Sequence, residues 1–207
     1  IDKNSAQRGL QVYIEVCASC HGLKHVAYRS LESLGYNKDQ INRIAAQFQI
    51  NDLPNDEGEI LKRKAIYSDY FVEPYKNYNS AKAANNGAYP PDLSLMVKAR
   101  KDGANYVRSL LLGYTDSLDG FDVGEGYYNK YMAGNIIAMP QPLYGNDVEY
   151  KDGTNASLEQ EVNDLVTFLT WTSMPDLEDR RAAGLKVIFF LFIMTIVFYL
   201  SYRKIWS

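Results

Sequence analysis

The sequence predicts an all-α domain with long loops, followed by one C-terminal helix that spans a membrane. Apolar residues recur at helical spacing in several separated segments of the first 174 residues. Between those segments lie stretches rich in glycine, asparagine, proline and tyrosine. Near the end, residues 187–200 contain only one clearly polar side chain, Thr195. We therefore expect a domain over residues 1–174 and an anchor helix with a short basic C-terminal end over residues 175–207.

The composition limits the kinds of partner that the protein can have. A chain of 207 residues with 46% hydrophobic residues is long enough for one ordinary domain with an appendage. Residues 1–179 carry a net charge of −8, whereas residues 180–207 carry +5. An acidic body does not favour nucleic acid, and it favours a basic protein partner.

The first expected helix covers residues 5–16, with Leu10, Val12 and Tyr13 among the apolar positions of its inner face. Ser5 is the expected N-cap because its hydroxyl can accept from a free backbone N–H. Gly9 interrupts the helix and lowers its intrinsic stability. The alternatives are a tolerated glycine and a close contact with another helix, and we favour the close contact.

The helix leads into Val16-Cys17-Ala18-Ser19-Cys20-His21, which contains the C-x-x-C-H signature of covalent haem attachment. Both thiols can add to haem vinyl groups, and His21 can then supply an axial imidazole to the iron. A zinc site would need about four Cys or His ligands. The chain has only these two cysteines and one further histidine, His25, which we expect at the surface. With no second motif, one haem is expected.

The haem also indicates where the domain lies. Attachment of this type implies export, but Ile1-Asp2-Lys3-Asn4 lacks the basic-then-apolar pattern of a signal peptide, so we infer that a leader was removed. The apolar run from Val187 to Leu200, extended to 182–202, approaches the roughly 20 residues that cross a bilayer. Since the haem domain lies on the export side, the basic C-terminal end lies inside.

The middle of the chain alternates expected helices with loops. We expect helices over 39–50, 93–100, 103–112 (ended by Gly113) and 157–171, the last with a capping box of Ser157 and Gln160. An acidic loop follows Ile50, and residues 115–135 show no clear element. Residues 60–91 have little periodicity, with turns at Asn85-Asn86-Gly87 and Pro90-Pro91. A loop this long needs a reason, such as covering a large flat cofactor.

The second axial ligand is open from the residues alone, because a c-type haem can be five-coordinate, bis-His or His/Met. Met139 is the favoured methionine, since Pro140 and Pro142 stiffen its loop. Met132, among several tyrosines, is second. Met96 reads as a core residue, and the remaining two methionines lie beside or within the expected membrane span.

Several segments together resemble the cytochrome c1 family, the haem subunits of quinol–cytochrome c reductase (bc1) complexes. The resemblance runs from about Gly9 to the C-terminus and rests on these segments: the haem motif with Ala27-Tyr28-Arg29, Ser68-Asp69-Tyr70-Phe71, residues 83–94, Ala99-Arg100, residues 110–114, and Ala138-Met139-Pro140. The C-x-x-C-H motif marks any c-type cytochrome. The run Asn-Asn-Gly-Ala-x-Pro-Pro-Asp-Leu with a single C-terminal span is far more specific.

The resemblance implies a class I cytochrome-c-like haem domain and a set of site residues. Cys17 and Cys20 match the attachment cysteines of one haem c, His21 matches the proximal ligand, and Met139 matches the distal ligand. Arg100 matches a partner of a haem propionate, a role that suits the bidentate guanidinium. The remaining matches are haem-crevice positions: Asn85, Pro90, Pro91 and Tyr114. With only two cysteines, a disulfide found in some members cannot form here.

The resemblance also implies a function. Within a bc1 complex of a respiratory chain, the protein would carry electrons from a Rieske iron–sulfur protein to a soluble or tethered cytochrome c, beside cytochrome b and membrane lipid. It would need no acid, base or nucleophile of its own, and the residues named above would serve the cofactor. The haem domain would face the periplasm of a bacterium or the mitochondrial intermembrane space. The alternatives are a free-standing tethered electron shuttle and, less favoured, an open-site haem enzyme or sensor.

Two acidic loops are the expected docking sites for a basic cytochrome c, with simple solvation as the alternative. The first loop carries Asp52, Asp56, Glu57 and Glu59, and the second carries Asp116, Asp119, Asp122 and Glu125.

Overall fold

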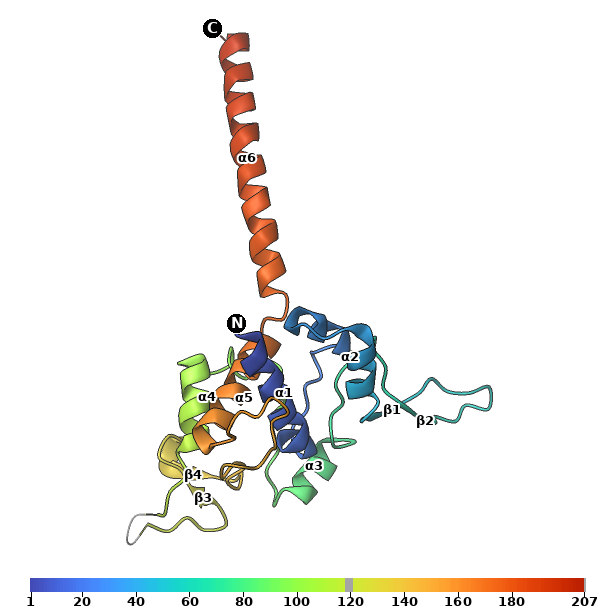
Figure 1. Ribbon diagram of the computed structural model, residues 1–207, viewed down its shortest axis with the longest axis vertical. Helices are drawn as coiled ribbons and strands as arrows, with labels where there is room; N and C mark the ends of the chain where they lie inside the picture. Colours follow the sequence, from blue (N-terminus) through green and yellow to red (C-terminus); the bar gives the residue numbers. More distant parts are fainter. Residues whose placement is uncertain (118–120, 207) are drawn as a thin grey trace. The chain divides into compact units, whose positions relative to one another are not determined.

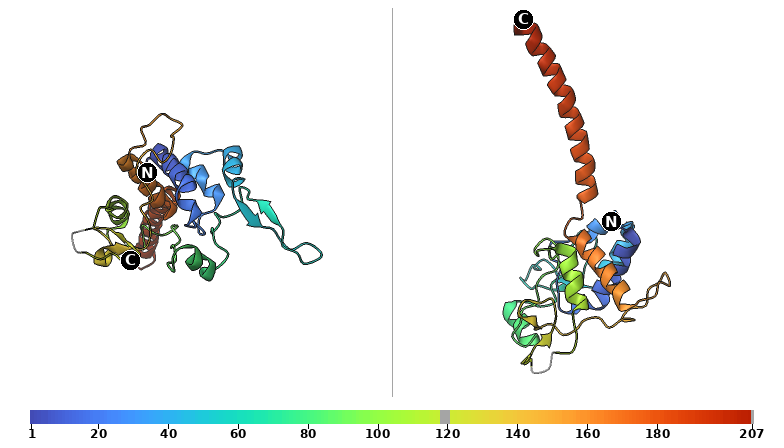
Figure 2. Two further views of the ribbon diagram at one scale, coloured as in Figure 1. Left: turned by 90° about the horizontal axis from the view of Figure 1, so that it is seen from below. Right: turned by 90° about the vertical axis from the view of Figure 1, so that its left-hand side faces the viewer.

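Two helices from opposite ends of the domain sequence, α1 (Lys3–Glu15) and α5 (Leu158–Thr172), form the centre of the fold. In this computed structural model, which describes residues 1–117 and 121–206, they cross side by side (Figures 1 and 2). Gly9 sits at the contact, where an added Cβ would lie 2.7 Å from Cβ of Phe168 and still closer to the carbonyl of Asp164. The close helix contact expected at Gly9 is therefore confirmed.

The N-terminal cap of α1 differs from the prediction. The carboxylate of Asp2 accepts from the backbone N–H groups of Asn4 (3.0 Å) and Ser5 (3.3 Å), so the helix begins two residues earlier than expected. The hydroxyl of Ser5 instead donates to the buried carboxylate of Asp164 at 2.6 Å. Arg8 donates to the same carboxylate at 2.8 Å, so a polar network joins α1 to α5.

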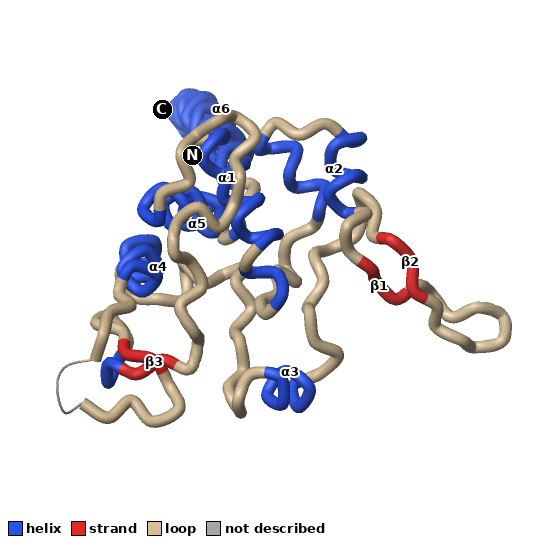
Figure 3. The backbone as a smooth tube through the Cα atoms, turned by 60° about the horizontal axis from the view of Figure 1, so that its bottom comes forward, coloured by secondary structure: helices blue, strands red, loops and turns tan. Residues whose placement is uncertain are grey.

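Long loops and short elements connect these helices (Figure 3). In order they are η1 (Cys17–Ser19), η2 (Tyr28–Leu34), α2 (Lys38–Ala45), β1 (Gln49–Asn51), β2 (Lys62–Lys64), α3 (Tyr78–Ala84), α4 (Gly103–Leu112), β3 (Tyr127–Tyr128), η3 (Ala133–Asn135) and β4 (Ile136–Ile137). The strands form two antiparallel pairs, β1 with β2 and β3 with β4. Helix α4 packs against α5, and the mostly helical fold with long loops is as expected.

The expected helix over 39–50 ends early. Helix α2 stops at Ala45, and residues 49–51 pair with β2, with Ile50 opposite Arg63. Phe48 sits at the change of direction, with its ring 6.1 Å from those of Tyr28 and Phe71. Its carbonyl accepts from the N–H of Ala65 at 3.0 Å. Long-range packing and strand pairing therefore replace the last helical turn.

The region 60–100 contains two further departures. Helix α3 lies in what the sequence predicted to be a loop, and Asn77 begins it with a capping box that includes Ser80. The helix expected over 93–100 is absent, and this segment consists of turns. The backbone N–H of Leu93 donates across to the carbonyl of Gly22 at 2.9 Å, and the N–H of Ser94 donates to the Asp92 carboxylate. These hydrogen bonds hold the segment in a non-helical conformation.

The remaining two helices of the domain follow the sequence pattern. Helix α4 has the bounds expected and ends at Gly113. A Cβ added at Gly113 would lie 2.7 Å from Oδ1 of Asn129. Ser157 caps α5 by accepting from the N–H of Gln160. Only half of the capping box forms, since the Gln160 amide donates to Asp164 instead.

The C-terminal part is a unit of its own, Met174–Ser207, distinct from the unit Ile1–Ser173. It contains α6 (Leu177–Trp206), which is long and apolar enough to cross a membrane. At 1.5 Å per residue, its 30 residues span about 45 Å, more than the roughly 30 Å hydrocarbon core of a bilayer. Basic Arg203 and Lys204 lie in its last turn, as an interfacial anchor requires.

Candidate haem site

The two cysteines lie on a tight turn that directly follows α1. The backbone N–H groups of Cys20 and His21 both donate to the carbonyl of Cys17, at 3.1 and 2.9 Å, and close the turn. Both cysteines are free and partly exposed as residues, and Cys17 packs against the core. Burial raises the pKa of the Cys17 thiol to about 12, so this group is a protonated thiol at neutral pH. The turn therefore presents two unpaired thiols three positions apart, as haem attachment requires.

His21 is held from two directions. Its ring Nδ1 lies 2.7 Å from the carbonyl oxygen of Pro91, and because a carbonyl only accepts, Nδ1 carries the proton. Its own backbone carbonyl accepts from the hydroxyl of Tyr13, a buried residue of α1, at 2.9 Å. Burial lowers the pKa of the His21 imidazole and favours the neutral ring. The lone pair of Nε2 is thus free to bind a metal, in the tautomer that such ligands adopt.

The segment after Pro91 runs alongside the segment after His21. In addition to the contact between Leu93 and Gly22, the N–H of Lys24 donates to Oδ2 of Asp92 at 2.9 Å, and the N–H of His25 donates to the hydroxyl of Ser94 at 3.1 Å. Gly22 permits this close approach, since an added Cβ would lie 3.3 Å from Oδ2 of Asp92 and 2.9 Å from Cγ of Glu73. The segments brace His21 against Pro91. The His25 side chain is exposed, as expected.

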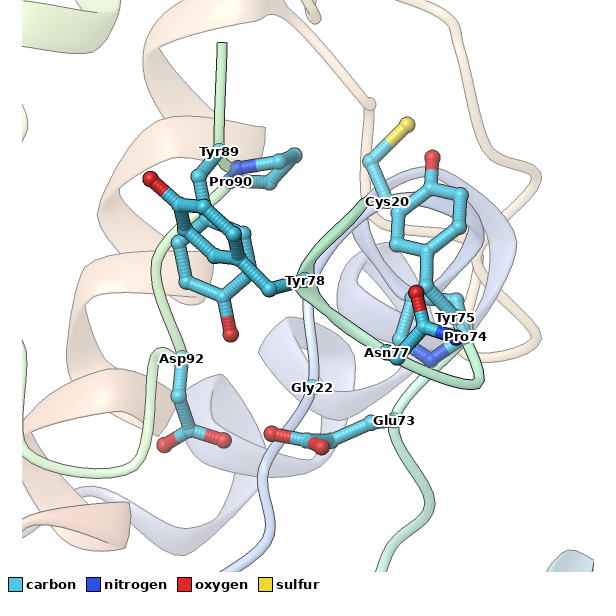
Figure 4. Close-up of a pocket in the computed structure, with 10 residues that line it drawn as sticks. All are labelled: Cys20, Gly22, Glu73, Pro74, Tyr75, Asn77, Tyr78, Tyr89, Pro90 and Asp92. Carbon is cyan, nitrogen blue, oxygen red and sulfur yellow. The ribbon is translucent and has the colours of Figure 1, made fainter. Parts of the chain in front are cut away.

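Pro90 lies in one recess with Cys20 and Tyr75, and Asn85 contacts Tyr75. Asn85 is the C-cap residue of α3. Its side-chain amide donates to the hydroxyl of Tyr75 at 3.0 Å and to the carbonyl of Ala81 at 2.7 Å. Pro90 and Cys20 line one small recess (Figure 4). The other lining residues are Gly22, Glu73, Pro74, Tyr75, Asn77, Tyr78, Tyr89 and Asp92.

Two further predicted site residues, Tyr114 and Met139, contact each other. The hydroxyl of Tyr114, just beyond α4, donates to the backbone carbonyl of Met139 at 3.1 Å. Burial raises the pKa of Tyr114, so its hydroxyl keeps the proton that it donates. The Met139 side chain is half-buried and packs against the core. By contrast, the thioether of Met132 accepts a weak contact from the Tyr106 hydroxyl at 3.9 Å.

Over residues 1–117 and 121–206, the structure records no contact between Arg100 and another predicted site residue. Its side chain is exposed, and Nη1 donates only to the neighbouring carbonyl of Ala99, at 3.2 Å. Among the described residues, its guanidinium makes no ion pair with a carboxylate within 4 Å.

Sequence reasoning missed the groups that hold the site in place. The sequence pattern marks Tyr13 only as an apolar position of α1, although a tyrosine in a buried stripe signals a hydroxyl that needs a partner. Tyr75 is one of many tyrosines in a region with little periodicity. The signal that could have located it is the Asn77-x-x-Ser80 capping pattern, which places Tyr75 just before a helix.

These residues fit a covalently held haem. Two free thiols, a neutral histidine with a fixed tautomer and a half-buried thioether are the donor set for c-type attachment and iron ligation. No group of three or more Cys, His, Asp or Glu side chains suited to a bare metal ion occurs among residues 1–117 and 121–206. The donor set matches a macrocycle better than an ion held by protein ligands alone.

Comparison with known proteins gives a consistent result. The family model described as "Cytochrome C1 family" matches residues 1–207. The chain is 47% identical over 191 residues to a potato protein named "Cytochrome c1-2, heme protein, mitochondrial", covering 92% of this chain and 74% of that protein. It is 39% identical over 223 residues to "Cytochrome c1" of Rhodospirillum rubrum, covering 99% of this chain and 82% of that one.

A third relative, "Cytochrome c1, heme protein, mitochondrial" of Neurospora crassa, is 46% identical over 202 residues, or 97% of this chain. The chain spans 60% of the length of that protein and 62% of the length of two Arabidopsis thaliana relatives. The match of the whole chain to the family model, with the extent of these identities, confirms the resemblance seen in the sequence. The chain therefore belongs to the cytochrome c1 family.

Proposed function

We propose that this chain is the membrane-anchored haem subunit of a quinol–cytochrome c reductase, carrying one electron at a time. The observation that carries the proposal is the contact between His21 Nδ1 and the Pro91 carbonyl, beside the free thiols of Cys17 and Cys20. A histidine with one nitrogen fixed by a backbone acceptor and the other available is arranged as an axial ligand. Membership of the cytochrome c1 family supports the same reading.

Each site residue has a proposed role toward a single haem c. Cys17 and Cys20 attach it, and His21 and Met139 are its axial ligands. When bound, the haem supplies the one-electron redox chemistry. Pro91 orients His21, and Tyr114 holds the backbone of Met139. Asn85 and Pro90 line the crevice on the Cys20 side. A methionine as second ligand raises the potential and keeps other molecules from the iron.

Arg100 is the proposed partner of a haem propionate. Its exposed guanidinium has no carboxylate partner among the described residues, which leaves its bidentate face available. Arg100 ends the turns of residues 93–100. Leu93 and Ser94, at the start of these turns, bond to the segment after His21, and these contacts tie the turns to the domain.

The proposed electron donor is a Rieske iron–sulfur protein and the proposed acceptor is a cytochrome c, with cytochrome b as a further partner. Helix α6 anchors the chain in the membrane. The domain is placed on the periplasmic side of a bacterial inner membrane or on the intermembrane-space side of the mitochondrial one. Relatives of both kinds, Rhodospirillum rubrum and mitochondrial proteins, support either location.

The test is purification from membranes in mild detergent, followed by rapid-mixing spectroscopy. The proposal predicts that the chain co-purifies with a cytochrome b and a Rieske protein. It also predicts that added quinol reduces its haem within turnover time and that cytochrome c then reoxidises it. A protein that purifies alone and accepts no electron from quinol would be a free-standing shuttle. A protein whose ferrous haem binds carbon monoxide at once would have an open site, and either result would contradict the proposal.

Two acidic loops are the proposed docking sites for a basic acceptor. At the tip of the β1–β2 hairpin, Asp56, Glu57 and Glu59 are exposed, whereas Asp52 pairs with Arg63 at 3.2 Å. In the second loop the exposed acids are Asp116, Asp122 and Glu125, and Asp119 lies outside the described residues. The second-order oxidation rate should fall as salt rises, and neutralising one of the two clusters should flatten that dependence. A flat wild-type profile would contradict electrostatic docking.

A further inference from the structure

The recess beside Cys20 contains a tyrosine whose hydroxyl the proposed function does not yet use. Tyr75 belongs to the chain segment that connects strand β2 to helix α3, and its side chain is half-buried. Its hydroxyl points to the same side of the recess as the sulfur of Cys20 (Figure 4). Both side chains line this recess. A thiol or thioether sulfur is a weak acceptor, so in a contact between the two the tyrosine hydroxyl donates and the sulfur accepts.

The direction of that hydroxyl is set by a second contact. The Asn85 amide donates to the oxygen of Tyr75 at 3.0 Å and also to the carbonyl of Ala81 at 2.7 Å. The amide nitrogen carries two hydrogens and both are used, so Asn85 can only be a donor to Tyr75. Because the Tyr75 oxygen accepts from Asn85, its single hydrogen is directed elsewhere, and the hydroxyl points to the side of the recess where the Cys20 sulfur lies (Figure 4).

Cys20 has little else to fix its side chain. It is partly exposed, and the only hydrogen bond recorded for its sulfur among the described residues is with the exposed Ser19 hydroxyl, at 3.7 Å. Cys17, by contrast, packs against the core at the end of α1. The first cysteine of the motif is therefore held by packing, whereas the second lacks that support.

We propose that Tyr75 is a positioning residue for the second attachment cysteine, with its hydroxyl oriented by Asn85 and donated to the sulfur of Cys20. This rests on the proposed haem attachment through Cys17 and Cys20. During attachment, the Cys20 thiol gives its sulfur to one vinyl carbon and its hydrogen to the other, and no other atom or electron is exchanged. A sulfur held in one orientation completes this addition more often than one that samples several rotamers.

The same contact acts on the finished thioether. A hydrogen bond donated to a sulfur bonded to the macrocycle withdraws electron density from it and stabilises the reduced state. Hydrogen bonding around a haem is one of the means by which a protein sets its potential. Tyr75 therefore raises the midpoint potential relative to a chain that lacks its hydroxyl.

The test is the Tyr75→Phe variant in the full membrane-bound protein, which keeps the ring and removes only the hydroxyl. Intact mass reports whether haem is covalently attached, and the pyridine haemochrome spectrum reports whether one or two thioethers form, because an unsaturated vinyl group shifts the band to longer wavelength. We expect an increased fraction of singly attached haem and, in the doubly attached fraction, a lowered midpoint potential. The matched control is Tyr78→Phe, since the Tyr78 ring lines the same recess but packs against the Tyr89 ring, with 4.8 Å between the ring centroids. The control should match wild type in both measurements.

Asn85 gives a second, independent measurement. If Asn85 acts on Cys20 through Tyr75, the potential shifts of Asn85→Ala and Tyr75→Phe will not add in the double variant. Additive shifts, or a Tyr75→Phe protein with wild-type attachment and potential, would overturn the proposal. These results leave the proposed function intact. That function fails only if the wild-type chain itself carries no haem bound through Cys17 and Cys20.

Discussion

The two sides of the candidate haem site are built differently. His21 follows α1 directly, and contacts from Tyr13, Pro91 and the segment 91–94 hold its ring and its backbone. Met139 lies in a loop after the short β4 strand, where one hydrogen bond from Tyr114 reaches its carbonyl. The histidine side is therefore part of the α1–α5 core, and the methionine side is attached to that core. We expect changes of the core to affect the whole domain and changes on the methionine side to affect ligation alone.

The first prediction concerns the core. Gly9→Val places side-chain carbons where the Asp164 carbonyl and Phe168 already lie, so α1 and α5 must separate. Overpacking of this kind costs about 1–3 kcal/mol or more. We expect a correspondingly lower free energy of unfolding in denaturant titrations, with partial loss of haem attachment. Gly184→Val is the matched control, because this glycine is also helical and nothing lies within 4 Å of an added Cβ there. Equal stability of Gly9→Val and wild type would contradict the close contact.

The second prediction concerns the attachment of the methionine side to α5. Buried Glu161 accepts from the N–H groups of Asp147 (2.8 Å) and Val148 (3.2 Å), which follow Met139 in the chain. Burial raises the pKa of Glu161 to about 7 from 4.5. The folded state therefore holds a proton that the unfolded chain has lost, and stability falls as pH rises from about 4.5 to about 7.

Glu161→Gln keeps an acceptor for both N–H groups and cannot ionise. Its melting temperature should therefore vary less with pH over that interval than the wild-type value does. Asp152→Asn is the control, because the pKa of that exposed carboxyl is lowered to about 2, chiefly by the backbone N–H of Thr154, and it stays ionised throughout. Parallel wild-type and Glu161→Gln profiles would show that Glu161 does not titrate in this range.

The third and smallest prediction concerns Tyr114. Tyr114→Phe removes the hydrogen bond to the Met139 carbonyl and leaves the ring in place. A single hydrogen bond of this kind contributes about 0.5–1.5 kcal/mol. The expected result is near-wild-type global stability, with faster binding of carbon monoxide to the ferrous haem because the methionine loop is less constrained. Tyr13→Phe, on the histidine side, should leave carbon monoxide binding unchanged. A reversed order of the two variants would contradict the comparison.

Some elements of the fold can be predicted from local sequence patterns, whereas others depend on contacts between distant segments. Helices α4 and α5 were predictable because their apolar faces repeat at helical spacing and glycine or serine marks an end. The helix expected over 93–100 fails because Leu93 and Ser94 bond to the segment after His21, and no local pattern encodes that pairing. Helix α2 ends early for a similar reason, since Phe48 packs among distant aromatic rings. Local periodicity predicts elements, and contacts between distant segments decide where they stop.

For the site, the covalent motif was readable because chemistry fixes its spacing. Cys17, Cys20 and His21 need no fold to be recognised, and the proline residues flanking Met139 singled out that methionine. The side chains that orient these groups were not readable, because Tyr13 and Tyr75 act through hydroxyl positions that only the fold determines.

The most direct test of His21/Met139 ligation is a comparison of Met139→Ala with Met132→Ala. Met139→Ala should keep its covalent haem, lose the far-red absorption band of ferric His/Met haem, lower the midpoint potential and bind carbon monoxide when reduced. Met132→Ala should retain the band, the potential and the closed iron. If Met139→Ala keeps the band and excludes carbon monoxide, Met139 is not the ligand and the proposed site is wrong on that side.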